Sequence, residues 1–392
     1  MKNILIISEF FPFPPYLNGE ISTLYHLIKS SYLSDQSVDL LYLENQRNEN
    51  EDVFIEDIKH IYRIPAIKKE ITISINGTKI LKPRGIWGIS CREFEGFDAS
   101  KYDFIVYGSM IEACINSKIC GERAVRIIFA ADSPILMYSQ KMVNEKKWIN
   151  ILYYQIQMKV CKTYEHLISQ QVDKIVYVSE IDTNVVREYL EGVDIRTARI
   201  GVDEFPKQFL HRKGGKIELG FSGLMTYRPN HLAVDFIINR VLPILDNRNI
   251  DYHMHIIGKD PDRKWITIAE KNERVTVTGF IDDIDTYIAG MDIYISPLFV
   301  GSGMKNKILQ ALSIGVPIIA SKTSVDGISG MRSGENFWLC DENPEKWADM
   351  IVELYNNYEK RVLFTNNGRK LIKEEYSWDR FARELLENDI LY

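Results

Sequence analysis

The feature that most constrains the fold is a set of short segments, rich in isoleucine and valine, that recur between helical patterns. Five of them span residues 4–8, 38–43, 104–108, 126–130 and 174–179, and five more span 217–223, 253–258, 275–279, 293–297 and 316–321. Strands that are apolar on both faces belong to parallel sheets covered by helices on each side. The sequence therefore predicts an α/β protein.

The two series of strands indicate two domains. Each series opens with an apolar strand that leads through a loop into a helix, and a length of 392 residues suits two domains. Between the series, residues 201–215 contain Pro206 and a Gly214-Gly215 pair, which is the composition of a linker. We predict two facing Rossmann-like domains, residues 1–206 and 207–372, with a cleft between them.

Composition excludes several classes of protein. The formal net charge of −6 offers no overall attraction to nucleic acid. The five cysteines are scattered and form no Cys-x-x-Cys pair, so we expect reduced, structural thiols and no zinc site. The longest apolar runs are too short to cross a membrane, and Glu9 interrupts the first one too early for a secretory leader. We therefore expect a cytoplasmic protein.

A glycine- and lysine-rich segment carries the clearest chemical signal. The strand at 293–297 leads into a loop with Gly301 and Gly303, and a helix follows with Lys305 and Lys307 at its start. Glycine lets backbone N–H groups approach a ligand, and a helix N-terminus favours an anion such as a diphosphate. Lysines there oppose the helix dipole by about 0.3–1 kcal/mol, which a bound anion would explain. The alternative is that both lysines are solvated surface charges.

Other polar clusters have simpler explanations. The acidic stretch at 282–285 resembles a metal site, but acids at the start of a helix also favour the helix dipole. His253 and His255 alternate along a strand, where we expect packing or hydrogen bonds and not metal binding. No metal site is predicted.

A helical pattern from about 139 to 171 leaves two interpretations open. Apolar residues, beginning with Trp148, recur at helical intervals beside Lys141, Lys146 and Lys147. This pattern fits a basic amphipathic surface in contact with anionic lipid. It also fits a surface helix that packs on its own domain with its lysines in water.

Several ordered motifs carry a resemblance to a known family. They lie at residues 12–15 with Gly19, 132–134, 164–165, 178–182, 201–203, 221–230, 299–317 and 326–328. In this order they resemble the GT-B glycosyltransferases, most closely family 4 and its exopolysaccharide-associated sugar transferases. The resemblance implies that a C-terminal helix, residues 373–392, crosses back to the first domain.

The resemblance also implies a set of site residues. Lys305 and Arg228 would be the catalytic cations, and Asp132 would assist the acceptor hydroxyl or the developing sugar cation. An alternative for Asp132 is the cap of a helix that begins at Ser133-Pro134. The residues implied to bind the donor are Gly19, Gly223, Ser302, Gly303, Lys307, Gln310, Asp326, Gly327 and Ile328.

Two of these positions depart from the family pattern. The family usually places glutamates where this chain has Ser302 and Gln310, and the second glutamate grips the ribose hydroxyls. A neutral amide accepts a weaker hydrogen bond than a carboxylate, by about 1 kcal/mol. We therefore expect Gln310 to weaken the grip on the donor without abolishing it.

The function implied by the resemblance is a metal-independent, retaining glycosyltransferase of the hexosyltransferase type. It would need no cofactor and would move a sugar from a nucleotide diphosphate donor, with UDP favoured, to a glycan or glycolipid acceptor in bacterial surface polysaccharide synthesis. Its partners would be donor and acceptor, with peripheral contact at the inner face of the membrane and none with nucleic acid. The alternatives are a non-catalytic nucleotide-sugar-binding protein and a GT-B sugar-nucleotide epimerase.

Overall fold

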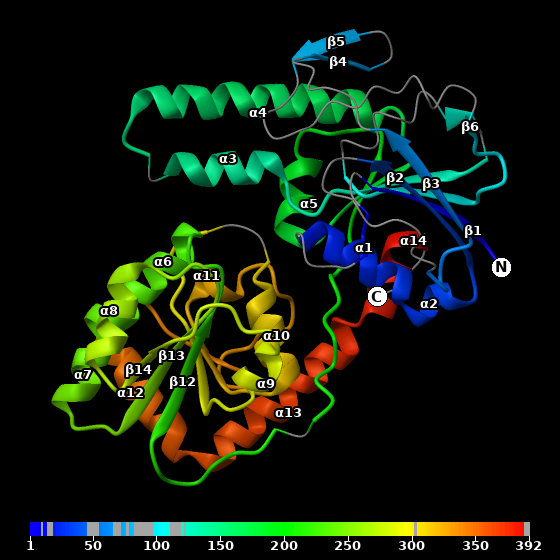
Figure 1. The fold of residues 1–392 in the computed structure, drawn as a ribbon. Coiled ribbons are helices and arrows are strands. Elements are labelled where there is room, and N and C mark those ends of the chain that lie inside the picture. Colours follow the sequence, from blue (N-terminus) through cyan, green and yellow to red (C-terminus); the bar gives the residue numbers. More distant parts are fainter. Residues whose placement is uncertain are drawn as a thin grey trace. The chain divides into compact units, whose positions relative to one another are not determined.

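The computed structural model describes residues 1–8, 11–13, 19–44, 55–65, 72–75, 78–81, 97–109, 119–120, 123–143, 145–207, 209–301 and 304–387. The chain divides into two compact units (Figure 1), residues 1–201 with 378–392 and residues 202–377. The sequence predicts boundaries after 206 and after 372. Each unit is described by itself.

The first unit is built on a parallel sheet. Among the described residues it has seven strands in the order β11-β10-β9-β7-β1-β2-β3. In chain order these strands are β1 (Asn3–Ser8), β2 (Ser37–Glu44), β3 (His60–Pro65), β7 (Phe104–Tyr107), β9 (Val125–Phe129), β10 (Lys174–Tyr177) and β11 (Asp194–Thr197). Short strands β4 (Thr72–Ile75), β5 (Thr78–Leu81), β6 (Phe97–Asp98) and β8 (Ile119–Cys120) form two small pairs.

Six helices are described in the first unit. They are α1 (Gly19–Lys29), α2 (Ser31–Ser34), α3 (Pro134–Val143), α4 (Trp148–Ser169), α5 (Glu180–Arg187) and α14 (Trp378–Leu386). The C-terminal helix α14 packs on this unit: the Phe381 ring lies edge-on to Phe129, with centroids 5.4 Å apart. The buried Lys174 ammonium donates to the last carbonyls of α14, those of Leu385 at 3.3 Å and Glu387 at 3.1 Å. A cation at the C-terminus of a helix also matches its dipole.

The second unit repeats the arrangement with six described parallel strands in the order β14-β13-β12-β15-β16-β17. These are β12 (Ile217–Ser222), β13 (Tyr252–Ile257), β14 (Val275–Val277), β15 (Ile293–Ser296), β16 (Ile318–Ala320) and β17 (Trp338–Leu339). The helices are α6 (Arg228–Phe236), continued by a π-helical turn at Ile237–Val241, α7 (Leu242–Asn247), α8 (Arg263–Lys271), α9 (Ile284–Ile288), α10 (Asn306–Ile314), α11 (Lys322–Val325), α12 (Pro344–Asn356) and α13 (Tyr358–Glu375).

The predicted α/β class is confirmed. Each of the ten apolar segments forms a strand of one of the two parallel sheets. The central strands are buried on both faces, as the adjacent residues Tyr294 and Ile295 of β15 illustrate. Alternation of strand and helix is what such a sheet requires, because each parallel connection must cross over one face of the sheet.

The single helical pattern predicted from about 139 to 171 is wrong in one respect. It contains two helices, α3 and α4, that lie side by side as a hairpin (Figure 1). Glu145 stabilises the turn between the two helices, because its carboxylate accepts from the Lys147 N–H at 2.9 Å and from the Asn150 amide at 2.8 Å. The apolar spacing continues across this turn, so periodicity alone does not reveal it. In the described part of the chain no helix is both long and apolar enough to span a bilayer.

Two glycines bring the ends of the central strands of the second unit together. The Gly223 N–H, after β12, donates to the carbonyl of Ile257 at 2.9 Å. A Cβ at Gly258, after β13, would lie 1.9 Å from the Gly223 carbonyl oxygen, and φ at Gly258 is +146°. Backbone atoms cannot yield to such an overlap, so position 258 accepts glycine alone.

We therefore predict that Gly258→Ala lowers the free energy of unfolding by about 2–4 kcal/mol, the range of a severe steric and backbone effect. Urea unfolding followed by fluorescence measures the loss. Gly215→Ala is the matched control, because Gly215 also has a positive φ, +92°, but a Cβ there meets no atom within 4 Å. An equal loss in both variants would show that φ alone, and not the contact with Gly223, matters.

Candidate functional site

The glycine- and lysine-rich segment leads from β15 to α10, at the carboxyl edge of the second sheet. Ser302 and Gly303 lie outside the described residues. Lys305 directly precedes α10 and is only 7% exposed. The helix ends at a left-handed Gly315 with φ +95°. The first turn of α10 contains no acidic residue, so its N-terminus presents two lysines and a positive dipole end together.

Lys307 reaches back to the end of β12. Its ammonium donates to the Asn230 side-chain carbonyl at 2.6 Å and lies 4.3 Å from the centre of the Phe221 ring. A Cβ at Gly223 would stand only 2.8 Å from the same ammonium. The alternative that both lysines are solvated surface charges is therefore wrong, because Lys305 is buried and the half-buried Lys307 is held against the β12 turn.

This environment shifts the proton equilibrium of Lys307. Burial, together with the positive charge of nearby Lys305, lowers the pKa of Lys307 to about 7. The neutral Asn230 carbonyl and the aromatic ring only partly replace the hydration that the ammonium loses. An added anion would favour the charged form, so the pair is suited to hold a phosphate group.

Gln310 has a partner that the sequence does not reveal. Its side-chain amide, one helical turn beyond Lys307 on α10, donates to the Asp285 carboxylate on α9 at 2.6 Å. Burial raises the pKa of Asp285, the Gln310 hydrogen bond opposes this rise, and the charges of Asp283 and Asp203 add to it. A half-buried carboxylate therefore lies next to Gln310 within the second unit.

The acidic stretch at 282–285 is therefore divided between two roles. Asp283 begins α9 as expected, since its carboxylate accepts from the Thr286 N–H at 3.0 Å. Asp285, one turn into the stretch, instead faces α10. The sequence interpretation treats all of these acids as helix-start residues and misses Asp285. Asp285 directly follows Ile284 and precedes the buried Ile288 by three residues, and this local pattern does not distinguish it from the other acids of the stretch.

The turn that contains Asp326, Gly327 and Ile328 follows α11. Asp326 is exposed, Gly327 has a φ of +86° and Ile328 is buried. Buried serines hold this turn to the end of β15. The Ser324 hydroxyl contacts the Ser296 hydroxyl at 2.9 Å and accepts from the Leu298 N–H at 3.3 Å.

Arg228 is the first residue of α6, and its side chain is exposed. The next residue, Pro229, packs close to the glycine loop: a Cβ at Gly301 would lie 3.2 Å from the Pro229 ring, and φ at Gly301 is +123°. The start of α6 and the loop before α10 are thus neighbours within the second unit.

Gly19 and Asp132 belong to the first unit. Gly19 begins α1, and the exposed Asp132 follows β9 after Ala131, whose φ is +41°. At the start of α3 the Ser133 hydroxyl accepts from the Leu136 N–H at 3.4 Å, and Pro134 takes the first helical position.

The two histidines of β13 are hydrogen-bonded, as predicted. The His255 ring contacts the Glu218 carboxylate at 2.7 Å and the Tyr287 hydroxyl at 2.9 Å, and His253 contacts the Thr276 hydroxyl at 2.7 Å. Within the described ranges no group of three or more acidic, histidine or cysteine side chains is placed to hold a metal ion.

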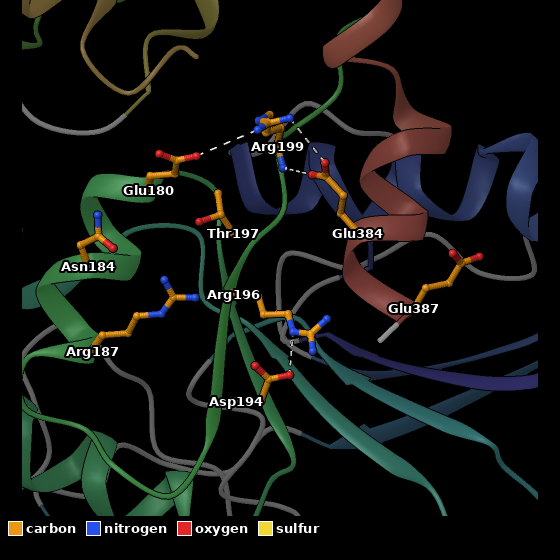
Figure 2. A pocket seen from close by; sticks show the side chains of 9 residues that line it. All are labelled: Glu180, Asn184, Arg187, Asp194, Arg196, Thr197, Arg199, Glu384 and Glu387. Atoms are coloured by element: carbon orange, nitrogen blue, oxygen red, sulfur yellow. Dashed lines mark hydrogen bonds and ion pairs between the residues drawn. The ribbon is translucent and has the colours of Figure 1, made fainter. Parts of the chain in front are cut away.

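Figure 2 shows a cavity of about 430 Å³ in the first unit, between α5, β11 and α14. Its charged side chains neutralise one another. Arg196 pairs with Asp194 at 2.7 Å, and the Arg199 guanidinium lies 3.7 Å from the buried Glu384 carboxylate. The Glu384 carboxylate also accepts from the Arg199 N–H at 2.7 Å. The Arg199–Glu384 contacts connect α14 to the segment after β11. The opposite charges leave the cavity without a dominant charge, so it does not resemble the lysine site.

Parts of this sequence are similar to known glycosyltransferases. Residues 216–357 match the family model described as Glycosyl transferases group 1. An uncharacterised glycosyltransferase of Methanocaldococcus jannaschii is 25% identical over 245 residues, 57% of this chain and 59% of that protein. An uncharacterised 44.6 kDa protein in the cps region of Klebsiella pneumoniae is 22% identical over 389 residues, 96% of this chain and 97% of that protein.

Solved structures extend the similarity to the whole chain. The crystal structure of TarM superposes with a TM-score of 0.68 over 98% of each chain at 13% identity. A mutant of S. aureus TarM has been solved in complex with fondaparinux, alpha-GlcNAc-glycerol and UDP. This chain spans only 49–60% of the length of three curated relatives that it matches.

The predicted resemblance is thereby confirmed at the level of the fold. The chain has the GT-B fold with two Rossmann-like units, and residues 216–357 of the second unit are similar to glycosyl transferases group 1.

The burial of Lys307 yields a prediction about its titration. Because its folded pKa of about 7 lies below that of an unfolded lysine, the unfolded chain binds more protons above pH 7. The contribution of Lys307 to the free energy of unfolding should therefore rise as the pH increases from about 7 to 10. NMR of ¹³C-labelled lysine should show one ε-carbon titrating near pH 7, and Lys305→Gln should raise that midpoint. Lys322→Gln, an exposed control on α11, should not move it. Titration of Lys307 near pH 10 would contradict the burial argument.

Proposed function

We propose that this chain is a glycosyltransferase that moves a sugar from a nucleotide diphosphate sugar to a hydroxyl group of a glycan or glycolipid. The observation that carries the proposal is the pair of lysines at the start of α10, with Lys305 buried and Lys307 held against Gly223. The UDP complex of a TarM mutant supports UDP as the nucleotide. The reaction is proposed to retain the anomeric configuration and to need neither metal nor cofactor.

The proposed chemistry follows from charge. As the bond between sugar and diphosphate breaks, negative charge grows on the leaving phosphate and positive charge on the sugar ring. Fixed cations beside the phosphate stabilise this transition state more than the bound substrate. Lys305 and Arg228 are proposed to supply those charges, with Lys307 gaining its proton when the anion binds. Ser302, Gly303 and Gly223 are proposed to line the phosphate site.

The nucleoside is proposed to lie beside α9 and α10. Asp285 supplies a carboxylate within hydrogen-bonding distance of Gln310, so the two together can accept from and donate to ribose hydroxyls. Asp326, Gly327 and Ile328 are proposed to line the donor sugar. This view replaces the expectation that Gln310 alone meets the ribose with a weakened grip.

The first unit is proposed to bind the acceptor, with Gly19 close to the bound substrates and Asp132 assisting the acceptor hydroxyl or the sugar cation. A role in bacterial surface polysaccharide synthesis is supported by the likeness to a protein of a Klebsiella cps region. We propose that the enzyme works in the cytoplasm at the inner face of the membrane, which it contacts peripherally.

Substitution of Lys305 tests the catalytic proposal. Lys305→Ala should lower kcat by about 10²–10³-fold, the effect of removing one preorganised transition-state contact. The measurement is acceptor-dependent release of nucleotide from a panel of nucleotide sugars in the presence of EDTA. Lys322→Ala on α11 is the control. Binding without turnover by the unmodified chain would favour a non-catalytic sugar-nucleotide-binding protein, and isomerisation without acceptor would favour an epimerase.

The Asp285–Gln310 pair yields a second test in which one substitution should reverse another. Asp285→Asn should weaken UDP binding by about 10-fold, since a charged hydrogen bond contributes about 1–2 kcal/mol more than a neutral one. Gln310→Glu should also weaken binding, because it opposes two carboxylates. The double variant should restore affinity by exchanging the partners. Calorimetry with UDP and 2′-deoxy-UDP measures this, and Asp283→Asn, the cap of α9, is the control. Additive losses would contradict the pairing.

A further inference from the structure

The tip of the α3–α4 hairpin exposes apolar side chains that the proposed sugar transfer does not use. Val143 ends α3, and the apolar side chains of α4 begin with its first residue. The exposed fractions are 79% for Val143, 74% for Trp148, 59% for Ile149, 47% for Leu152 and 49% for Ile156. We call these five residues the hairpin tip patch. They are a third of the large exposed hydrophobic residues recorded for the described chain, within only 14 positions of sequence.

Three residues of the hairpin tip patch share one side of α4. Trp148, Leu152 and Ile156 follow one another at intervals of four, so they lie in a row along α4. The row spans about 12 Å of helix, at 1.5 Å per residue. Beyond Ile156 the exposed side of α4 becomes polar, with Lys159, Lys162 and His166. The apolar surface is therefore confined to the tip of the hairpin.

Positive charge surrounds the patch. The segment from 141 to 162 contains five lysines, at 141, 146, 147, 159 and 162, and one acid, Glu145, in a chain of net charge −6. All five lysines are exposed, and Lys146 and Lys147 occupy the turn between the helices. The first turn of α4 contains no acidic residue, although acids there would favour the helix dipole. Helix stability does not explain this arrangement, whereas an anionic partner does.

We infer that the hairpin tip patch rests on an anionic lipid surface. Tryptophan and large aliphatic residues on one side of a helix, flanked by lysines, suit the boundary between headgroups and acyl chains. The apolar row would enter that boundary while the lysines remain among the lipid phosphates. The inference adds a specific surface to the peripheral contact proposed above, but it does not depend on sugar transfer.

A second copy of this chain fits the patch less well. A symmetric dimer would bring the same lysines of both copies together, and the cores of protein interfaces are depleted in lysine. A bilayer of anionic lipid supplies opposite charge to every lysine at once. The observations therefore favour lipid over self-association.

Sedimentation of the whole chain with vesicles tests this inference. We expect binding to vesicles of phosphatidylcholine with 30% phosphatidylglycerol to be at least 10-fold tighter than to phosphatidylcholine alone, and to weaken with salt. Trp148→Gln with Leu152→Gln should reduce it at least 10-fold, as should Lys146→Gln with Lys147→Gln. These side chains are exposed, so the variants should keep the melting temperature of the parent.

Two control variants remove similar groups elsewhere. Leu210→Gln alters a leucine that is 76% exposed, and Lys370→Gln with Lys373→Gln removes two exposed lysines of α13. Both controls should bind vesicles like the parent chain. Fluorescence gives a local signal, because the blue shift on anionic vesicles should shrink when Trp148 is replaced by tyrosine.

Three results would overturn the inference. The first is that the parent chain binds no vesicles, and the second is that the controls lose as much binding as the tip variants. The third is a dimer, seen by light scattering, that the tip substitutions dissociate, which would assign the patch to a second copy. A parent chain that binds vesicles but transfers no sugar would refute the proposed function and would leave this inference unaffected.

Discussion

The close approach between the Lys307 ammonium and the Gly223 backbone is the contact on which the candidate site depends. It joins the start of α10 to the end of β12, two elements that are more than 80 residues apart in sequence. It exists only because position 223 has no side chain, and Gly258 in turn permits the Gly223 carbonyl to lie where it does. Two strand ends, those of β12 and β13, and the start of α10 thereby meet in contacts that tolerate little change.

That contact makes an unfavourable contribution to the free energy of folding. A lysine whose pKa falls to about 7 is an ammonium that the folded chain solvates poorly, and no carboxylate is recorded as its partner among the described residues. An anion at this point would supply the missing charge, so binding and local stability should be coupled. The lysines are therefore better explained by a ligand than by the needs of the fold, which would be met by a neutral residue.

The sequence predicts most of the architecture and only part of the site. Apolar segments locate all ten expected strands because burial on both faces leaves a strong pattern. The edge strand β11 escapes because its residues, such as Asp194 and Arg196, are charged. The Gln310–Asp285 pair escapes for a different reason: it joins residues 25 positions apart on two helices. Such pairs depend on helix packing, which local pattern does not encode.

The net charge of the chain does not reveal its two local clusters of positive charge. An overall charge of −6 gives no general attraction, yet the start of α10 and the hairpin tip are both locally positive. At physiological ionic strength charges are screened beyond about 8 Å, so each cluster acts on what touches it and not on distant molecules. The two differ in burial. Lys305 is enclosed, which would suit a small anion of fixed geometry, whereas Lys146 and Lys147 are exposed and would suit an extended surface.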